Sequence, residues 1–194
     1  MNRESLLLFG GSFDPIHMGH LAIAQLALET LGLQKVLFIP AAHNPLKESR
    51  ATNSDHRLAM VEHAIESNSQ FICWDGEIKR SGDSYTYDTI VTLEKEYPNT
   101  DLYFLIGSDN VASFHRWYRA ADIIAKVTLV VVERPGFEVV FSPELALESF
   151  KTVLSPYWGI SSSLLRNYLK DGLSCNYLLP SEVVRYIDQK KLYS

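Results

Sequence analysis

GGSFDPIHMGH, residues 10–20, is the stretch that decides the fold of this 194-residue chain. It follows the apolar run LLLF at residues 6–9, which is typical of a buried strand, and it leads into a periodic apolar pattern typical of a helix. A chain that leaves a strand, turns on two glycines and enters a helix directs backbone N–H groups and the positive end of the helix dipole toward one point. The stretch therefore predicts an anion site, which His17 and His20 face from the first helical turn.

Strand-like and helix-like segments alternate along the rest of the chain. The strand-like runs are short, β-branched or aromatic, and almost wholly apolar, as in strands covered on both faces: 6–9, 36–39, 71–74, 102–106 and 127–132. Helices are expected at 21–31, 54–65, 89–97, 111–125, 161–169 and 181–190. The alternation predicts an α/β fold with a Rossmann-like, doubly wound and mainly parallel sheet and C-terminal helices. Between residues 135 and 151, helix and loop interpretations compete.

Composition and charge limit the classes of function. The length fits a single domain over residues 1–194, and the net charge of −5 argues against a nucleic-acid partner while leaving a small anionic ligand open. The apolar runs are far shorter than the roughly 20 residues that span a bilayer, and the start lacks a signal-peptide pattern, so we expect a cytoplasmic protein with no membrane partner. Cys73 and Cys175 have no metal-ligand spacing, so both are expected to be reduced and structural, and no metal site is predicted.

A second motif stands at residues 160–166, ISSSLLR. Consecutive serines at a helix start supply a cap and backbone amides, and Arg166, one turn inside the helix, can bind a phosphate through two hydrogen bonds. Alone, this motif is an ordinary helix cap with a surface arginine, and residues 10–20 alone could be a tight turn with surface histidines. Residues 10–20 are neither a dinucleotide fingerprint nor a Walker loop, and the two histidines lack an adjacent third ligand for zinc. Together the two motifs favour a phosphate site.

Residues 10–20 and 160–166 resemble the two signature motifs of the HxGH nucleotidyltransferases. The segments between them resemble the nicotinate-nucleotide adenylyltransferase family in order and spacing, over nearly the whole chain; they are Glu77-x-x-Arg80, Ser84-Tyr85-Thr86, Ile106-Gly107-Ser108-Asp109, Trp117-Tyr118 and Glu133-Arg134-Pro135-Gly136. The chain departs from that family at residues 43–47, HNPLK, where the family often has Pro-Pro-His-Lys, so His43 is displaced. Ser12 and Ser163 replace threonines and keep the hydroxyl.

The resemblance implies adenylyl transfer from ATP to nicotinate mononucleotide, which yields nicotinate adenine dinucleotide and pyrophosphate in NAD biosynthesis. It implies in-line attack with no covalent enzyme intermediate, and Mg²⁺ that arrives with ATP rather than on protein ligands. The catalytic residues that it implies are His17, His20 and Arg166, and the ATP-binding residues are Gly10, Gly11, Ser12, Phe13, Ser162 and Ser163. The mononucleotide-binding residues that it implies are Lys47, Tyr85, Thr86, Asp109, Trp117, Tyr118 and Arg134.

Some of these residues also have a purely structural interpretation. Trp117 stands at helical spacing with Phe114 and fits a core position as well as a stacking one; Asp109 fits a turn, and Lys47 fits a solvated loop. For the whole chain, the alternatives are another member of the superfamily, either specific for phosphopantetheine or preferring the nicotinamide mononucleotide, and a catalytically silent nucleotide-binding regulator. The sequence also leaves open whether identical copies of the chain assemble.

Overall fold

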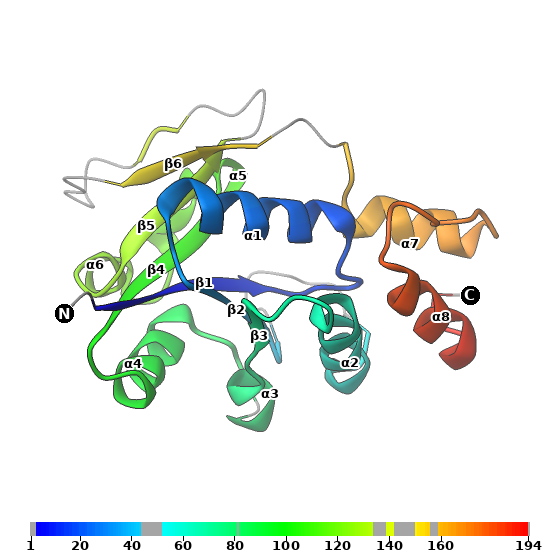
Figure 1. Ribbon diagram of the computed structural model, residues 1–194, viewed down its shortest axis with the longest axis horizontal. Helices are drawn as coiled ribbons and strands as arrows, with labels where there is room; N and C mark the ends of the chain where they lie inside the picture. Colours follow the sequence, from blue (N-terminus) through cyan, green and yellow to red (C-terminus); the bar gives the residue numbers. More distant parts are fainter. Residues whose placement is uncertain are drawn as a thin grey trace.

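The computed structural model describes residues 3–43, 52–80, 82–133, 139–141, 150–155 and 159–193. Over these residues six strands form one sheet in the order β3-β2-β1-β4-β5-β6, and each neighbouring pair is parallel. The strands are β1 (Glu4–Gly11), β2 (Lys35–Pro40), β3 (Phe71–Cys73), β4 (Thr100–Gly107), β5 (Thr128–Glu133) and β6 (Lys151–Leu154). The helices are α1 (Met18–Leu31), α2 (Ser54–Ile65), α3 (Gly76–Arg80), α4 (Thr86–Glu96), α5 (Ser108–Val111), η1 (Phe114–Arg116), α6 (Ala120–Ile124), α7 (Ser162–Lys170) and α8 (Ser181–Lys190) (Figure 1).

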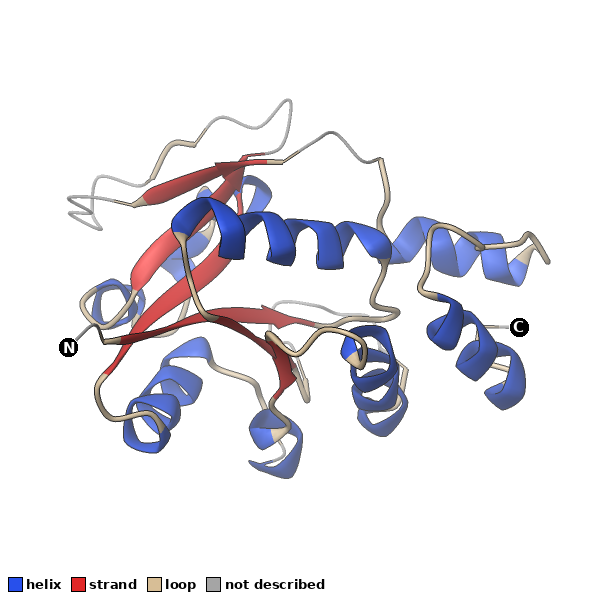
Figure 2. Ribbon diagram, in the orientation of Figure 1, coloured by secondary structure: helices blue, strands red, loops and turns tan. Residues whose placement is uncertain are grey.

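Helices cover both faces of the sheet, so the strands lie between two apolar layers (Figure 2). In β1, Leu7 belongs to one core cluster with side chains of α1, α2, α7 and α8, whereas Leu6 and Leu8 belong to a second cluster with side chains of α4, η1 and α6. Successive side chains of a strand point to opposite faces, and here both faces are buried. This is why the strands read as continuous apolar runs, and it confirms the predicted Rossmann-like α/β fold.

The five predicted strands and most of the predicted helices are present, with ends that differ by a few residues. Helix α1 ends as expected at Gly32, whose φ of 63° is the left-handed conformation that glycine adopts without strain. Helix α2 is capped by Asn53, whose side chain accepts a hydrogen bond from the backbone N–H of Asp55. Strand β6 was not predicted, and α3 occupies a segment in which no helix was predicted.

The prediction of one helix over residues 111–125 is wrong. The structure divides this segment into the short helices α5, η1 and α6. Trp117 is extended at φ −70° and ψ 145°, and Arg119 has a left-handed φ of 57°, so neither residue continues a helix. Phe114 and Ile123 are nevertheless fully buried. The spacing of these apolar residues therefore reflects their burial against the sheet and does not indicate one continuous helix.

Helices α7 and α8 lie beyond the N-terminal end of α1, next to the carboxyl end of β1 (Figure 1). Two hydrogen bonds fix this arrangement. The hydroxyl of Ser162 donates to the backbone oxygen of Pro15 at 3.0 Å, and the backbone N–H of Met18 donates to the backbone oxygen of Leu178 at 3.0 Å. The C-terminal helices thus lie beside the carboxyl ends of the strands, which is where parallel sheets bind their ligands.

Candidate active site

A cleft of about 1270 Å³ opens at the carboxyl ends of the strands. Its walls come from the loops after β1, β2 and β4, from the end of β5, and from the start of α7. The cleft brings together most of the residues proposed from the sequence; those that line it are Gly10, Gly11, Ser12, Phe13, His17, His20, Asp109, Trp117, Ser162, Ser163 and Arg166. The two sequence motifs, about 140 residues apart, therefore meet in one place.

The two histidines stand together at the start of α1. His17 is the N-cap residue and is 5% exposed, and His20 is half-buried. Their imidazole rings stack, with centroids 3.6 Å apart and planes inclined by 22°. The ring of Phe13 meets the His20 ring edge to face at 5.2 Å, which limits how His20 can turn.

A hydrogen bond fixes which nitrogen of His20 can carry the proton. The backbone N–H of His17 donates to Nδ1 of His20 at 3.2 Å, so Nδ1 must be an acceptor in this arrangement. The proton of a neutral His20 imidazole then resides on Nε2. Because His20 lines the cleft, Nε2–H is the group it can offer to a phosphate oxygen.

Two glycines of the motif make room for these rings. A Cβ atom on Gly11 would lie 2.9 Å from the ring of Phe13, which is itself 2% exposed and cannot move aside. A Cβ atom on Gly19 would lie 3.1 Å from Nδ1 of His17. The glycines thus allow the aromatic and imidazole rings to pack directly against the backbone.

The amides at the strand-to-helix turn are less available than the sequence predicted. The N–H of His17 binds Nδ1 of His20, and the N–H of Met18 binds the backbone oxygen of Leu178. The expectation that several unpaired amides point at the anion is therefore wrong for these two groups. At this end of α1 the side chains of both His17 and His20 line the cleft.

Helix α7 presents its N-terminus and Arg166 to the cleft. Ser161 caps it, since its hydroxyl accepts the N–H of Leu164 at 3.2 Å. Arg166 donates from Nη1 to the backbone oxygen of Asp14 at 2.7 Å and from Nη2 to the hydroxyl of Ser163 at 3.1 Å. A guanidinium carries five N–H groups, and within the described ranges the structure records bonds for two of those of Arg166.

The mononucleotide-side residues divide into two groups. Trp117 and Asp109 line the cleft, and Trp117 also packs on Phe114 and Phe104 at ring distances of 5.0 and 6.0 Å. The stacking and core interpretations of Trp117 are therefore compatible, because one part of the side chain faces the core and another faces the cleft. Asp109 is exposed on α5, immediately after β4.

Tyr85, Thr86 and Tyr118 are not among the residues that line the cleft. The rings of Tyr85 and Tyr118 lie 5.0 Å apart, and Tyr118 is 51% exposed. Tyr85 reaches the carboxylate of Asp83, whose other oxygen lies 2.8 Å from Nδ1 of the cleft residue His43. The Asp83 carboxylate raises the pKa of the Tyr85 phenol. These residues therefore border the cleft rather than form its wall.

Lys47 and Arg134 lie outside the described residues, so their proposed phosphate contacts stay predictions. Among the described residues there is no group of three His, Cys, Asp or Glu side chains placed to hold a metal ion. None of the helices in the described ranges is long and apolar enough to cross a membrane. Cys73 and Cys175 are both free, and burial raises the pKa of both thiols, that of Cys73 to about 12, so both stay protonated.

Sequence reasoning missed a buried polar cluster behind the motif. Asp14 is 6% exposed, and its carboxylate accepts the hydroxyl of Tyr193 at 2.6 Å and the N–H of Thr52 at 3.1 Å. Arg57, 2% exposed, donates to three backbone oxygens of the surrounding loops. A signal for Arg57 existed, because it stands at helical spacing with the buried Met60 and so places a charge on the apolar face of α2. The sequence carried no comparable signal for Tyr193.

A second buried cluster supports the segment before α4. Glu77 is 6% exposed and accepts a hydrogen bond from the hydroxyl of Thr89, and Arg80 lies 3.3 Å from that hydroxyl. Burial raises the pKa of Glu77, although hydrogen bonds from Thr89 and Ser84 act in the opposite direction. The pair Glu77 and Arg80, which the sequence matched to a family segment, thus packs behind the cleft and does not line it.

Comparisons with known proteins agree with this geometry. Residues 8–168 match the family model described as cytidylyltransferase-like. A relative from Herpetosiphon aurantiacus, named "probable nicotinate-nucleotide adenylyltransferase", is 42% identical over 199 residues, which span 100% of this chain and 99% of the relative. A relative of the same name from Bacillus cytotoxicus is 41% identical over 96% of each chain.

Solved structures match the fold over almost the whole chain. The nicotinic acid mononucleotide adenylyltransferase of Plasmodium falciparum, solved in complex with NaAD, superposes with a TM-score of 0.80 at 21% identity, covering 98% of this chain and 97% of that one. At this identity the likeness concerns the fold, whereas the family follows from the relatives that are closer in sequence. The chain therefore belongs to the cytidylyltransferase-like family and, within it, to the nicotinate-nucleotide adenylyltransferases, which are nucleotidyltransferase enzymes.

Proposed function

We propose that this enzyme transfers the adenylyl group of ATP to nicotinate mononucleotide, giving nicotinate adenine dinucleotide and pyrophosphate. The observation that carries the proposal is the meeting of His17, His20 and Arg166 in a cleft whose other wall holds Trp117 and Asp109. The first three groups suit a polyphosphate, and the last two suit an aromatic ring and a ribose. The names of the full-length relatives point to the same pair of substrates.

In this proposal the mononucleotide 5′-phosphate attacks the α-phosphorus of ATP in line with the departing pyrophosphate. A new P–O bond forms as the bond from the α-phosphorus to the bridging oxygen breaks, and the leaving oxygen keeps the electron pair. No covalent enzyme intermediate is needed, so catalysis rests on position and on stabilising negative charge as it develops. ATP enters as its Mg²⁺ complex, and the ion belongs to the substrate.

The ATP side has the donors that such a reaction needs. We assign the Nε2–H of His20, with His17 stacked against its ring, to an oxygen of the α-phosphate, because His20 lines the cleft with residues 10–13. The guanidinium of Arg166, with Ser162 and Ser163 at the N-terminus of α7, holds the β- and γ-phosphates. The charge that collects on pyrophosphate is thus met by a guanidinium and a helix N-terminus.

The mononucleotide side recognises a pyridine ring that bears a carboxylate. We assign Trp117 to the ring and Asp109 to a ribose hydroxyl, with Tyr118 at the rim. The N-terminus of α4, at Tyr85 and Thr86, suits the carboxylate, because the helix dipole and the first amides favour a negative charge. Lys47 and Arg134 are proposed to contact the mononucleotide phosphate.

Pyrophosphate release tests the proposal directly. The enzyme is mixed with MgATP and, in separate reactions, nicotinate mononucleotide, nicotinamide mononucleotide or phosphopantetheine, and the dinucleotide product is identified by mass. We expect the fastest release with nicotinate mononucleotide. Release only with phosphopantetheine would assign a different acceptor, and no release with any acceptor would favour a silent nucleotide-binding protein.

The in-line step has its own test. ATP made chiral at the α-phosphorus by sulfur substitution gives a product whose configuration can be read. One direct displacement inverts that centre, whereas two displacements through an adenylylated enzyme retain it. Retention would therefore overturn the proposed mechanism while leaving the overall reaction in place.

A further inference from the structure

We propose that Arg57 is a positioning residue that couples the ATP side of the cleft to the mononucleotide side, an inference that rests on the proposed function. Arg57 lies on α2, is 2% exposed, and holds three backbone oxygens with three different nitrogen atoms. Nη1 donates to Ser12 at 2.7 Å, Nη2 to Ala42 at 3.0 Å and Nε to Thr52 at 2.8 Å. One guanidinium thus joins the loop after β1, the loop after β2 and the start of α2.

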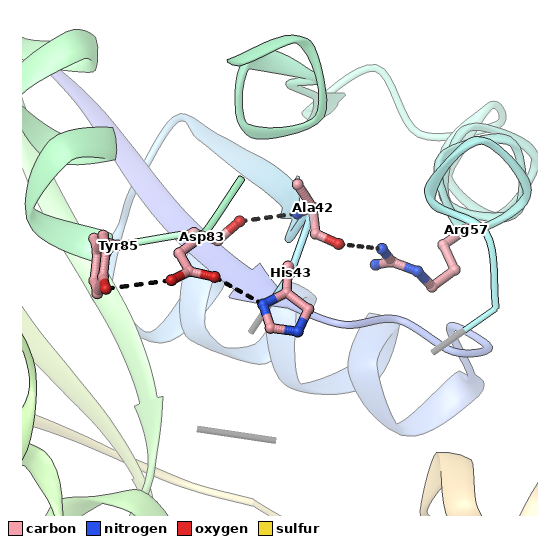
Figure 3. Close-up of polar contacts among 6 residues, drawn as sticks. Ala42, His43, Arg57, Asp83 and Tyr85 are labelled. Carbon is pink, nitrogen blue, oxygen red and sulfur yellow. Dashed lines mark hydrogen bonds and ion pairs between the residues drawn. The ribbon is translucent and has the colours of Figure 1, made fainter. Parts of the chain in front are cut away.

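The contact with Ala42 continues to the other half of the site. The backbone N–H of Ala42 donates to the hydroxyl of Ser84 at 2.9 Å, and the backbone N–H of Ser84 donates to the oxygen of His43 at 2.8 Å. Figure 3 shows Arg57 on one side of Ala42 and the segment with Asp83 and Tyr85 on the other. Ser84 directly precedes Tyr85. A continuous series of hydrogen bonds therefore runs from Ser12, beside the ATP phosphates, to the start of α4.

The burial of Arg57 makes these contacts act as a unit. Burial lowers the pKa of Arg57, and the nearby Asp14 carboxylate opposes that shift and balances the charge. A buried guanidinium that loses an acceptor leaves a charged donor unsatisfied, which costs more than the net value of an ordinary hydrogen bond. A displacement of the Ser12 loop thus carries the guanidinium with it, and the guanidinium carries Ala42.

This series of hydrogen bonds predicts that each substrate increases the affinity of the enzyme for the other. A nucleotide that holds Ser12 in the arrangement seen here also fixes Ala42 and, through it, Ser84. The mononucleotide then binds to a segment that the nucleotide has already ordered. Its binding carries a smaller loss of conformational entropy, so it binds more tightly than it would alone. Linkage requires the effect to be equal in both directions.

The coupling is measured by titration calorimetry with α,β-methylene ATP and Mg²⁺, with and without saturating nicotinate mononucleotide. For the wild type we expect the mononucleotide to tighten analogue binding about fivefold or more. Arg57→Lys should bring that ratio close to one, because an ammonium presents its donors from a single atom and cannot span three carbonyls. Arg185→Lys, the same substitution at an exposed pair with Glu182, is the control and should keep the wild-type ratio.

Ser84→Ala breaks the same connection at its far end and serves if Arg57→Lys does not fold. It removes the acceptor for the N–H of Ala42, together with the hydrogen bond from Ser84 to Glu77, and it should lower the coupling ratio as Arg57→Lys does. Its control is Ser174→Ala, which removes an exposed hydroxyl that accepts the N–H of the neighbouring Asn176. A wild-type ratio of one, or a ratio unchanged in the variants, overturns the inference. A wild-type enzyme that binds neither ligand and releases no pyrophosphate overturns the proposed function as well.

Discussion

Nη1 of Arg166 lies 2.7 Å from the backbone oxygen of Asp14, so the second sequence motif is bonded directly to the first. Ser162 makes a parallel contact with the backbone oxygen of Pro15 at 3.0 Å. Both contacts join residues about 150 positions apart in the chain, and both end on the turn that carries His17 and His20. Arg166 therefore has two tasks that must be separated: it fastens α7 to this turn, and it is proposed to bind the phosphates of ATP.

Arg166→Ala is expected to raise the KM for ATP and lower kcat/KM about 10²-fold, because a charged hydrogen-bond donor to the leaving group is lost. Binding of nicotinate mononucleotide, measured by calorimetry, should stay within about threefold of the wild type. Ser162→Ala removes the parallel contact with Pro15 and a proposed neutral phosphate contact, but no charge, so its effect is an upper limit on what loosening of α7 costs. Equal impairment of ATP use by the two substitutions would contradict a separate role for the charge of Arg166.

His20→Ala should reduce kcat by about 10²-fold, a barrier change of about 2.7 kcal/mol, because the Nε2–H donor to a phosphate oxygen is lost. Steady-state pyrophosphate release measures the change. His20→Asn separates the two ring nitrogens, since the asparagine oxygen can still accept the N–H of His17 but nothing replaces Nε2. The asparagine variant should be as slow as the alanine variant. Near wild-type turnover in either one would remove Nε2 of His20 from catalysis.

The sequence was sufficient for the parts of the fold that local pattern controls. Strands covered on both faces produce apolar runs that are visible without a structure, and the order of strands and helices leaves few topologies. The segment at residues 111–125 shows the limit. Its buried positions recur with a helical spacing, yet Arg119 adopts a left-handed φ that no residue preference indicated. Periodicity reports which side chains are buried and is silent on breaks in the backbone between them.

The sequence predicted residues that line the cleft, but it did not predict the residues that hold this site together. His17, His20 and Arg166 belong to compact motifs, and the structure brings them together in one cleft. The contacts that hold the surrounding loops in place could not be predicted from the sequence. Arg57, for example, binds backbone oxygens, which every residue type provides. Tyr193 reaches Asp14 from 179 positions away. Contacts of this kind depend on the finished tertiary fold.

The enzyme should prefer the acid form of the mononucleotide over the amide form by roughly 10- to 100-fold in kcat/KM, the value of a hydrogen bond to a charged group. Thr86→Pro tests whether the backbone amide at the start of α4 is responsible. Proline is tolerated at the first position of a helix, and Tyr85 is already extended at φ −92° and ψ 123°, as a residue before proline must be.

Kinetics with both mononucleotides should show that Thr86→Pro loses most of this preference, because the N–H is gone. Thr86→Ala, which keeps the N–H and loses only the side chain, is the matched control and should retain the preference. A proline variant as selective as the wild type would show that the carboxylate is recognised elsewhere.

Glu77→Gln is expected to change how stability depends on pH. Burial raises the folded-state pKa of Glu77 above its ordinary value of 4.5, so the folded protein holds this proton more tightly than the unfolded chain does. The stability that Glu77 contributes is complete below pH 4.5 and is lost as the pH rises through the folded-state pKa. Glutamine stays neutral and can still accept the hydroxyl of Thr89. As the pH rises, the free energy of unfolding of the wild type should therefore fall relative to that of Glu77→Gln, by at most about 1.4 kcal/mol per pH unit.

Urea unfolding of both proteins at several values between pH 4 and pH 8 measures this difference, and subtracting the two curves removes the titration of all other groups. Glu66→Gln, the same substitution on an exposed side chain at the end of α2, shows what the loss of a solvated carboxylate does. A difference between wild type and Glu77→Gln that stays constant over this range would mean that folding leaves the pKa of Glu77 at its ordinary value. The carboxylate would then have to be held by Arg80, and Arg80→Gln would destabilise the protein most at high pH.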